Sequence, residues 1–134
     1  MPNDCWNHIT IVSHTDPDEL LTLIHNEFMY KNDKDKLLFH EHIEFIEQGE
    51  RGIKIIAWSP WKPNFEWLSK MIHTYKSCWI KNSWNEEGGM NGIWIGKITE
   101  DGPEIVNHHW EELCIEAEFA YFKQTDYFKS SESP

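Results

Sequence analysis

The chain has 134 residues, with 23 Asp or Glu against 12 Lys or Arg, which gives a formal net charge of −11 at pH 7. A chain of this length forms one domain with its own core, so neither metal nor disulfides are required for folding. A negative field of this size disfavours direct binding to the phosphate backbone of DNA or RNA. It is compatible with ordinary solubility, with a basic protein partner, or with mimicry of nucleic acid toward a basic cleft.

The three cysteines and the N-terminal residues indicate in which cellular compartment the protein resides. Cys5, Cys78 and Cys114 are an odd number without the dense spacing of a secreted disulfide scaffold, which indicates reduced thiols. The N-terminus lacks a signal-peptide pattern, and no apolar run reaches the roughly 18 residues that span a bilayer. We therefore expect a cytoplasmic protein that does not enter membranes.

The N-terminal part of the chain predicts a strand followed by a helix. Residues 6–12 are rich in β-branched side chains and alternate in polarity. Asp16 is expected to cap a helix with Pro17 at its first position and Glu19 completing a capping box. The apolar face of this helix is expected to comprise Leu20, Leu21, Ile24 and Phe28.

The middle of the chain predicts a loop, a hairpin and a second helix. Residues 31–36 are all polar or charged and read as a solvated loop. Two strands follow, near residues 42–46 and 53–58, joined by a tight turn at 49–52. Pro63 is well placed to start a helix, whose apolar face comprises Phe65, Leu68, Ile72 and Tyr75.

The C-terminal part predicts a second hairpin and a third helix. Residues 78–84 and 92–98 read as strands joined by a glycine-containing turn. A turn at 101–103 and a short strand at 104–107 come next. One face of a last helix would then carry Trp110, Leu113, Cys114, Ala117 and Tyr121.

The order of these elements predicts the fold class. A β-α-β-β-α-β order is that of an α+β ferredoxin-like sandwich, in which two helices cover one face of an antiparallel sheet. A C-terminal strand and helix would be added to this core. We expect a single domain over residues 1–124 and a flexible tail over residues 125–134.

Three short motifs resemble those of one family. They are MPNDCWN at residues 1–7, AWSP at residues 57–60 before a helix, and the acidic glycine turn EEGGMNG at residues 86–92. In this order they resemble the ferredoxin-like domain family of phages and plasmids typified by the YubB protein. The resemblance implies that fold and a viral or mobile-element setting, in the host cytoplasm or the virion, and it carries no reaction. Residues 31–40 depart from the family, whose members have an Asn-Trp-Gly-Thr-Lys-Trp-like block there.

Two places suggest catalytic or metal chemistry. His40 and His42 would project to the same side of a strand, as two metal ligands must, but no third ligand is apparent nearby. Glu86 and Glu87 are paired carboxylates in the Glu86–Gly92 loop, yet adjacent residues in extended chain point apart and do not converge as an acid–base pair. Neither place therefore predicts a catalytic site, a metal or another cofactor.

Aromatic residues suggest a binding surface instead. The strands carry apolar side chains on both faces, and two helices cover only one face, so the other must meet the last helix, a partner chain or a ligand. We expect the binding residues to be Trp58, Trp61, Trp79, Trp94, Glu86 and Glu87.

The sequence thus favours a non-enzymatic protein-binding or assembly protein of a virus, phage or mobile element. Its partner would be a protein, for which a basic surface would complement the acidic charge, and homo-oligomerisation stays open. One alternative is a small enzyme or metal-binding protein centred on His40/His42 or the Glu86–Gly92 loop. The other is a structural component of a virus particle.

Overall fold

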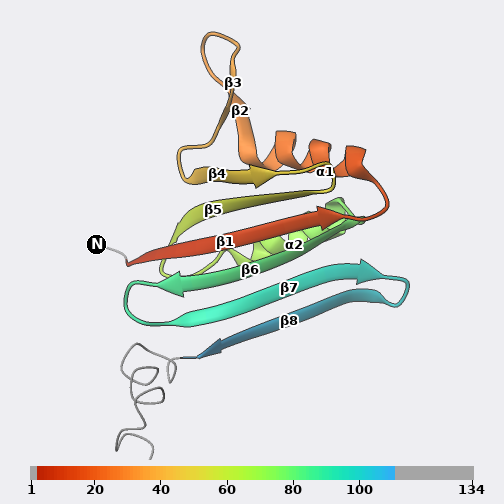
Figure 1. Cartoon of the computed structure of the whole chain (residues 1–134). Coiled ribbons are helices and arrows are strands. Elements are labelled where there is room, and N and C mark those ends of the chain that lie inside the picture. Colours follow the sequence, from red (N-terminus) through yellow and green to blue (C-terminus); the bar gives the residue numbers. More distant parts are fainter. Residues whose placement is uncertain (1–2, 111–134) are drawn as a thin grey trace, which may run out of the picture.

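The structure is a computed structural model that describes residues 3–110. Its main feature is one antiparallel sheet, seen from its open side in Figure 1. The six strands, in their order across the sheet, are β4 (Ile43–Gln48), β5 (Gly52–Pro60), β1 (Asp4–Ser13), β6 (Cys78–Glu86), β7 (Asn91–Thr99) and β8 (Gly102–Trp110). The N-terminal strand therefore lies in the middle, paired with β5 on one side and β6 on the other.

Two short helices and a small second sheet complete the described chain. The helices are α1 (Pro17–Leu23), which continues into a π-helical turn η1 (Ile24–Phe28), and α2 (Phe65–Thr74). Strands β2 (Met29–Lys31) and β3 (Leu37–Phe39) form a hairpin that projects beyond the edge strand β4 (Figure 1). No helix among residues 3–110 is long and apolar enough to cross a membrane.

The expectation of a ferredoxin-like sandwich is wrong. The described chain is mostly β, with a six-stranded antiparallel sheet, a separate two-stranded sheet and only two short α-helices. The residues on either side of the expected loop at 31–36 form an unexpected strand pair, Met29–Lys31 with Leu37–Phe39. The short strand expected at 104–107 is longer, because its pairing with β7 extends from Gly102 to Trp110 and includes part of the expected turn. Trp110, expected in a helix, ends β8; the rest of that helix and the expected boundary at residue 124 lie outside the described residues.

The start of α1 confirms part of the expected cap. Asp16 caps the helix, its side chain accepting from the Glu19 amide at 3.2 Å, and Pro17 is the first residue. The Glu19 carboxylate does not return to Asp16 but accepts from the backbone N–H of Ser77 at 2.7 Å, while Ser13 Oγ accepts from the Asp16 amide. The capping box is thus replaced by a link between α1 and the segment before β6.

The buried face of α1 and η1 differs from the expected one at one residue. Leu20, Ile24 and Phe28 are buried as expected, but Leu23 is buried and Leu21 is 53% exposed. The helix ends after seven residues and its last turn is π-helical, which changes the face that meets the sheet.

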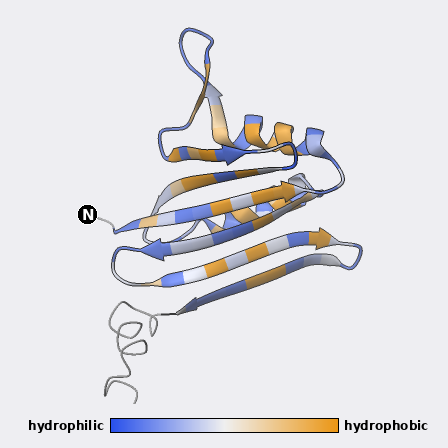
Figure 2. Ribbon diagram, in the orientation of Figure 1, coloured by the Kyte–Doolittle hydropathy of each residue, from blue (hydrophilic) through white to orange (hydrophobic). Residues whose placement is uncertain are grey.

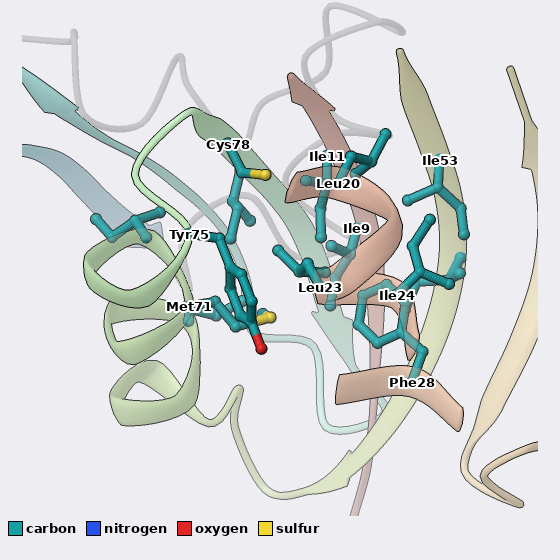
Figure 3. Close-up of a cluster of buried hydrophobic side chains, with 14 of the residues drawn as sticks. Ile9, Ile11, Leu20, Leu23, Ile24, Phe28, Ile53, Met71, Tyr75 and Cys78 are labelled. Carbon is teal, nitrogen blue, oxygen red and sulfur yellow. The ribbon is translucent and has the colours of Figure 1, made fainter. Parts of the chain in front are cut away.

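Both helices pack on one face of the sheet and enclose the core. Alternate residues of β1 and β6 are buried against this face. Figure 2 shows hydrophobic and hydrophilic residues interspersed along the strands. In Figure 3 the side chains of Leu23 and Phe28 from α1 and η1, and Met71 from α2, point toward those of the strands. Burial of these apolar side chains supplies most of the stabilisation, at roughly 25 cal/mol per Å² removed from water.

The opposite face of the sheet, termed here the open face, carries a mixture of apolar and charged side chains. Among the described residues it exposes Val12, Trp79, Ile95 and Val106. Lys97 lies over the Trp79 ring, with its Nζ atom 4.5 Å from the ring centroid. Within residues 3–110, the sheet is therefore covered by helices on one side only.

Candidate ligand cavity

A cavity of about 740 Å³ opens on the helix-covered side of the sheet, between the first turn of α2 and the connection from β3 to β4. Strands β1, β5 and β6 contribute to its lining, and η1 contributes Glu27. Volumes between about 300 and 1,000 Å³ are typical of small-molecule sites. The fold thus provides a space that a ligand or a partner side chain can enter.

Two buried asparagines from neighbouring strands line this cavity. Asn7 of β1 is 4% exposed and Asn82 of β6 is 1% exposed. Each occupies a position in its strand that points to the core, between apolar neighbours on the same face. Asn82 Nδ2 donates to Asn7 Oδ1 at 2.9 Å, which joins residues 75 positions apart in the sequence.

The hydrogen bonds of Asn7 determine the orientation of both amides. Asn7 Nδ2 donates to the carbonyl oxygen of Ala57 at 2.9 Å and to Ser59 Oγ at 2.8 Å. A backbone carbonyl only accepts, so the nitrogen of Asn7 must face Ala57 and its oxygen must face Asn82. Asn82 then has to present its nitrogen to Asn7, and its oxygen points elsewhere.

The oxygen of Asn82 has no hydrogen-bond partner. Asn82 Oδ1 is buried and is one of two buried side-chain polar atoms within residues 3–110 that make no hydrogen bond. A buried acceptor left unpaired costs about 1–3 kcal/mol, so such groups are rare in folded proteins. Asn82 is one of the residues that line the cavity, so its unpaired oxygen lies beside this space but is covered by neighbouring atoms. A donor that enters the cavity can reach the oxygen only where these neighbours move.

Aromatic and charged residues make up much of the remaining lining. Phe65 and Trp67, in the first turn of α2, are half-buried and pack against the core. Trp67 Nε1 donates to Glu27 Oε1 at 2.9 Å, and the Tyr75 hydroxyl donates to Glu27 Oε2 at 3.0 Å. This carboxylate therefore ties η1 to α2 at the side of the cavity.

The helix α2 begins at the cavity for local reasons. Asn64 is its N-cap, with Oδ1 accepting from the Trp67 amide at 3.1 Å, and Pro63 precedes the cap rather than starting the helix as expected. Trp61 just before it has a φ of 68°, an uncommon conformation for a bulky residue. Its N–H donates to the carbonyl of Asn3 at 2.8 Å, which holds the turn in place.

The histidines expected as a ligand pair lie together at the cavity. The rings of His40 and His42 have centroids 5.6 Å apart, and Tyr30 stacks on His40 at 5.2 Å. Burial, and then the proximity of His40, lower the pKa of His42 from its usual value. No group of three or more His, Cys, Asp or Glu residues in the described part of the chain is arranged to hold a metal ion.

The four tryptophans expected to form one binding surface lie in separate places. Trp94 is 2% exposed and lies in the core, whereas Trp61 is 57% exposed on the turn after β5. Trp79 and Trp58 both belong to the open face, but Trp79 lies opposite Val12 at one end of β1 and Trp58 lies opposite Trp6 near the other end, beside the cavity. The fold therefore does not bring these residues into a single patch.

The two glutamates of the Glu86–Gly92 loop have separate structural contacts. Glu86 is buried and its Oε1 accepts from Asn3 Nδ2 and from the Gly88 amide. Glu87 is exposed, and its Oε1 accepts from the Asp4 amide at 3.1 Å. Both carboxylates hold this loop to the N-terminal end of β1.

The cysteine thiols are poor candidates for nucleophiles. Burial raises the pKa of Cys5 to about 11, although a hydrogen bond with Ser59 opposes this shift. Burial likewise raises the pKa of Cys78 to about 11. Both thiols therefore stay protonated near neutral pH, and the thiolate is the reactive form.

Comparison with known proteins adds no assignment: no family model, no curated protein and no solved structure matches the chain. The resemblance to the YubB family stays a prediction.

Proposed function

We propose that the protein is a non-enzymatic binding protein whose ligand enters the cavity and donates a hydrogen bond to Asn82. The observation that carries this proposal is the unpaired, buried Asn82 Oδ1 in the cavity lining. A fold that merely needed a core would have an apolar residue at this position, because an unpaired polar atom costs stability. A bound donor removes that cost.

The groups around the cavity support binding rather than catalysis. Asn7 and Asn82 are amides, which neither ionise nor transfer protons near neutral pH. The ligand we propose is a group of a partner protein, since the charge of −11 favours association with a basic surface. In a virus, phage or mobile element, such a protein would act by holding another protein.

Protein-observed NMR with simple probes tests the proposal. The side-chain amide signals of Asn82 and Asn7 are followed during titration with n-butylammonium, acetamide and n-butanol, each of which donates a hydrogen bond. At least one probe is expected to shift both signals in a saturable way. Asn82→Leu should abolish the response, whereas Asn85→Leu, the same change on the opposite face of β6, should leave it intact. If no probe shifts these signals, the proposal is wrong.

A second candidate is proton-transfer catalysis at His40 and His42. The lowered pKa of His42 favours the neutral imidazole, which can accept a proton. Hydrolysis of activated esters by the purified chain, compared with a His42→Gln variant, tests this candidate. Activity that the variant loses would favour the enzyme; equal rates for both proteins would exclude this role for His42.

A further inference from the structure

The charged residues that line the cavity indicate which class of ligand it can bind. Glu27 and Glu66 contribute carboxylates to the lining and Lys62 contributes a single ammonium group. The lowered pKa of His42 favours its uncharged form near neutral pH, so this ring adds no positive charge. Two carboxylates, an unpaired amide oxygen and one cation leave the lining with an excess of negative and acceptor groups.

The apolar part of the lining includes aromatic rings from α2. Phe65 and Trp67 lie in the first turn of α2, beside the carboxylate of Glu66. Aromatic faces attract ammonium and guanidinium groups through the ring quadrupole, by about 0.5–2 kcal/mol depending on desolvation. Carboxylates, a carbonyl-type acceptor and aromatic rings are together the groups that bind an organic cation.

We propose that the ligand group of this cavity is an alkylammonium ion, which donates one N–H to Asn82 Oδ1 and lies against the aromatic wall. This inference rests on the proposed function and names its ligand class. An ammonium has three donors and no acceptor. It therefore satisfies an unpaired acceptor without adding one of its own.

Two features of the site act against a cation, and the lining offsets both. The N-terminus of α2 carries a partial positive charge, but Asn64 Oδ1 accepts the Trp67 amide there, and Glu66 places a full negative charge in the same turn. Lys62 and Glu66 are both exposed, so their opposite charges offset each other, and the half-buried Glu27 carboxylate supplies the remaining negative charge. The overall charge of −11 further favours a cation.

Two sources supply an alkylammonium: a lysine side chain of a partner protein and a free amine. The full chain is titrated with n-butylammonium, with its neutral counterpart n-butanol, and with Nα-acetyl-lysine N-methylamide. Binding is measured by calorimetry and by the Asn82 side-chain signals. The two ammonium probes are expected to bind about tenfold tighter than n-butanol, and added salt should weaken only the ammonium probes.

Matched variants separate the site from the general charge of the protein. Glu66→Gln removes a carboxylate from the lining, whereas Glu50→Gln removes one from the exposed turn between β4 and β5, with the same change in net charge. The first should weaken ammonium binding severalfold and the second should not. Because Glu66 is exposed, its substitution leaves the core intact, which keeps the test independent of the folding of the Asn82→Leu variant.

The outcomes distinguish the two proposals. Tighter binding of the lysine derivative than of n-butylammonium identifies a lysine of a partner, and the reverse identifies a free amine; both support the ammonium site. Equal binding of n-butanol and n-butylammonium at Asn82 would overturn the ammonium proposal and leave the binding function standing. Equal effects of Glu66→Gln and Glu50→Gln would also overturn it. No response of Asn82 to any probe would overturn both proposals.

Discussion

Asn7 and Asn82 are polar residues flanked by apolar ones on their strand faces, and they define the candidate site more closely than the histidine pair does. Asn7 Nδ2 has two partners at 2.9 Å or less, whereas Asn82 Oδ1 has none. The sequence carried a signal for both residues, since each is a polar residue at an alternate strand position whose neighbours two residues away are apolar. Their hydrogen bond could not be predicted, because it depends on β1 and β6 being neighbours in the sheet.

The stability of two variants tests this description. In the parent chain the unpaired buried acceptor is Asn82 Oδ1. In Asn82→Leu that atom is gone, but Asn7 Oδ1 loses its donor, so the variant also has one unpaired buried acceptor. The free energy of unfolding is therefore expected to change by no more than about 1 kcal/mol. Asn7→Leu leaves Asn82 Nδ2 without its partner and removes one of the two hydrogen bonds of Ser59 Oγ, which still donates to the Lys62 carbonyl, and it should cost about 2 kcal/mol or more. Urea denaturation measures both, and a larger loss for Asn82→Leu than for Asn7→Leu would contradict the assigned orientation.

The buried thiols make stability depend on alkaline pH. Cys5 and Cys78 have pKa values raised from 9.0 to about 11 by burial. Between these values the unfolded chain loses thiol protons that the folded chain keeps, so stability falls as pH rises from about 9 to about 11. Between pH of about 8 and about 10.5, the free energy of unfolding should fall less in Cys78→Ala than in the parent chain. Chemical denaturation at each pH measures this free energy. An identical loss in both proteins would show that the Cys78 thiol contributes nothing to it.

At the scale of the elements, two glycines of β7 make room for tryptophans on the covered face. A Cβ at Gly96 would lie 2.4 Å from the Trp94 ring, and one at Gly92 would lie 2.5 Å from the Trp84 ring. Both rings are buried, so they have little room to move away from an added Cβ. Gly96→Ala should therefore destabilise the fold by about 1–3 kcal/mol, which is typical of overpacking.

Gly49 provides the control for this substitution. It lies in the turn between β4 and β5, and a Cβ there would meet nothing within 4 Å. Gly49→Ala is expected to change stability by less than about 1 kcal/mol. Thermal unfolding compares the two variants, and equal melting temperatures would show that the Trp94 side chain can adapt to a Cβ at Gly96.

The sequence predicted strands where polar and apolar residues alternate. The central strands carry a regular alternation, and β1, β5, β6 and β7 all contain the stretches expected from the sequence. The β2–β3 hairpin was missed because residues 31–36 contain no apolar side chain, so hydropathy gives no sign that the flanking residues pair. The π-helical turn was missed because it changes the helical period on which the assignment of Leu21 depended.

At the scale of the whole molecule, charge is unevenly distributed over the sheet. The open face of the inner strands β5, β1, β6 and β7 includes Lys54, Lys81 and Lys97, although the chain as a whole has a net charge of −11. The edge strands β4 and β8 contribute Glu44, Glu47 and Glu104 to the same face. Screening acts over about 8 Å at physiological salt, so a polyanion that contacts this face interacts mainly with these local charges and less with the net charge of the whole chain.

We expect the chain not to bind duplex DNA or single-stranded RNA at physiological salt. Three lysines can neutralise only a few phosphates, the Lys97 ammonium already lies over Trp79, and the glutamates of the edge strands border the lysines on both sides. Fluorescence anisotropy with labelled oligonucleotides measures this, with a Lys54→Glu/Lys81→Glu variant as the control. Micromolar binding by the parent chain that weakens steeply with salt and is lost in the variant would contradict the expectation. It would show that the open face, with Trp79 as a stacking platform, overrides the repulsion of the acidic chain.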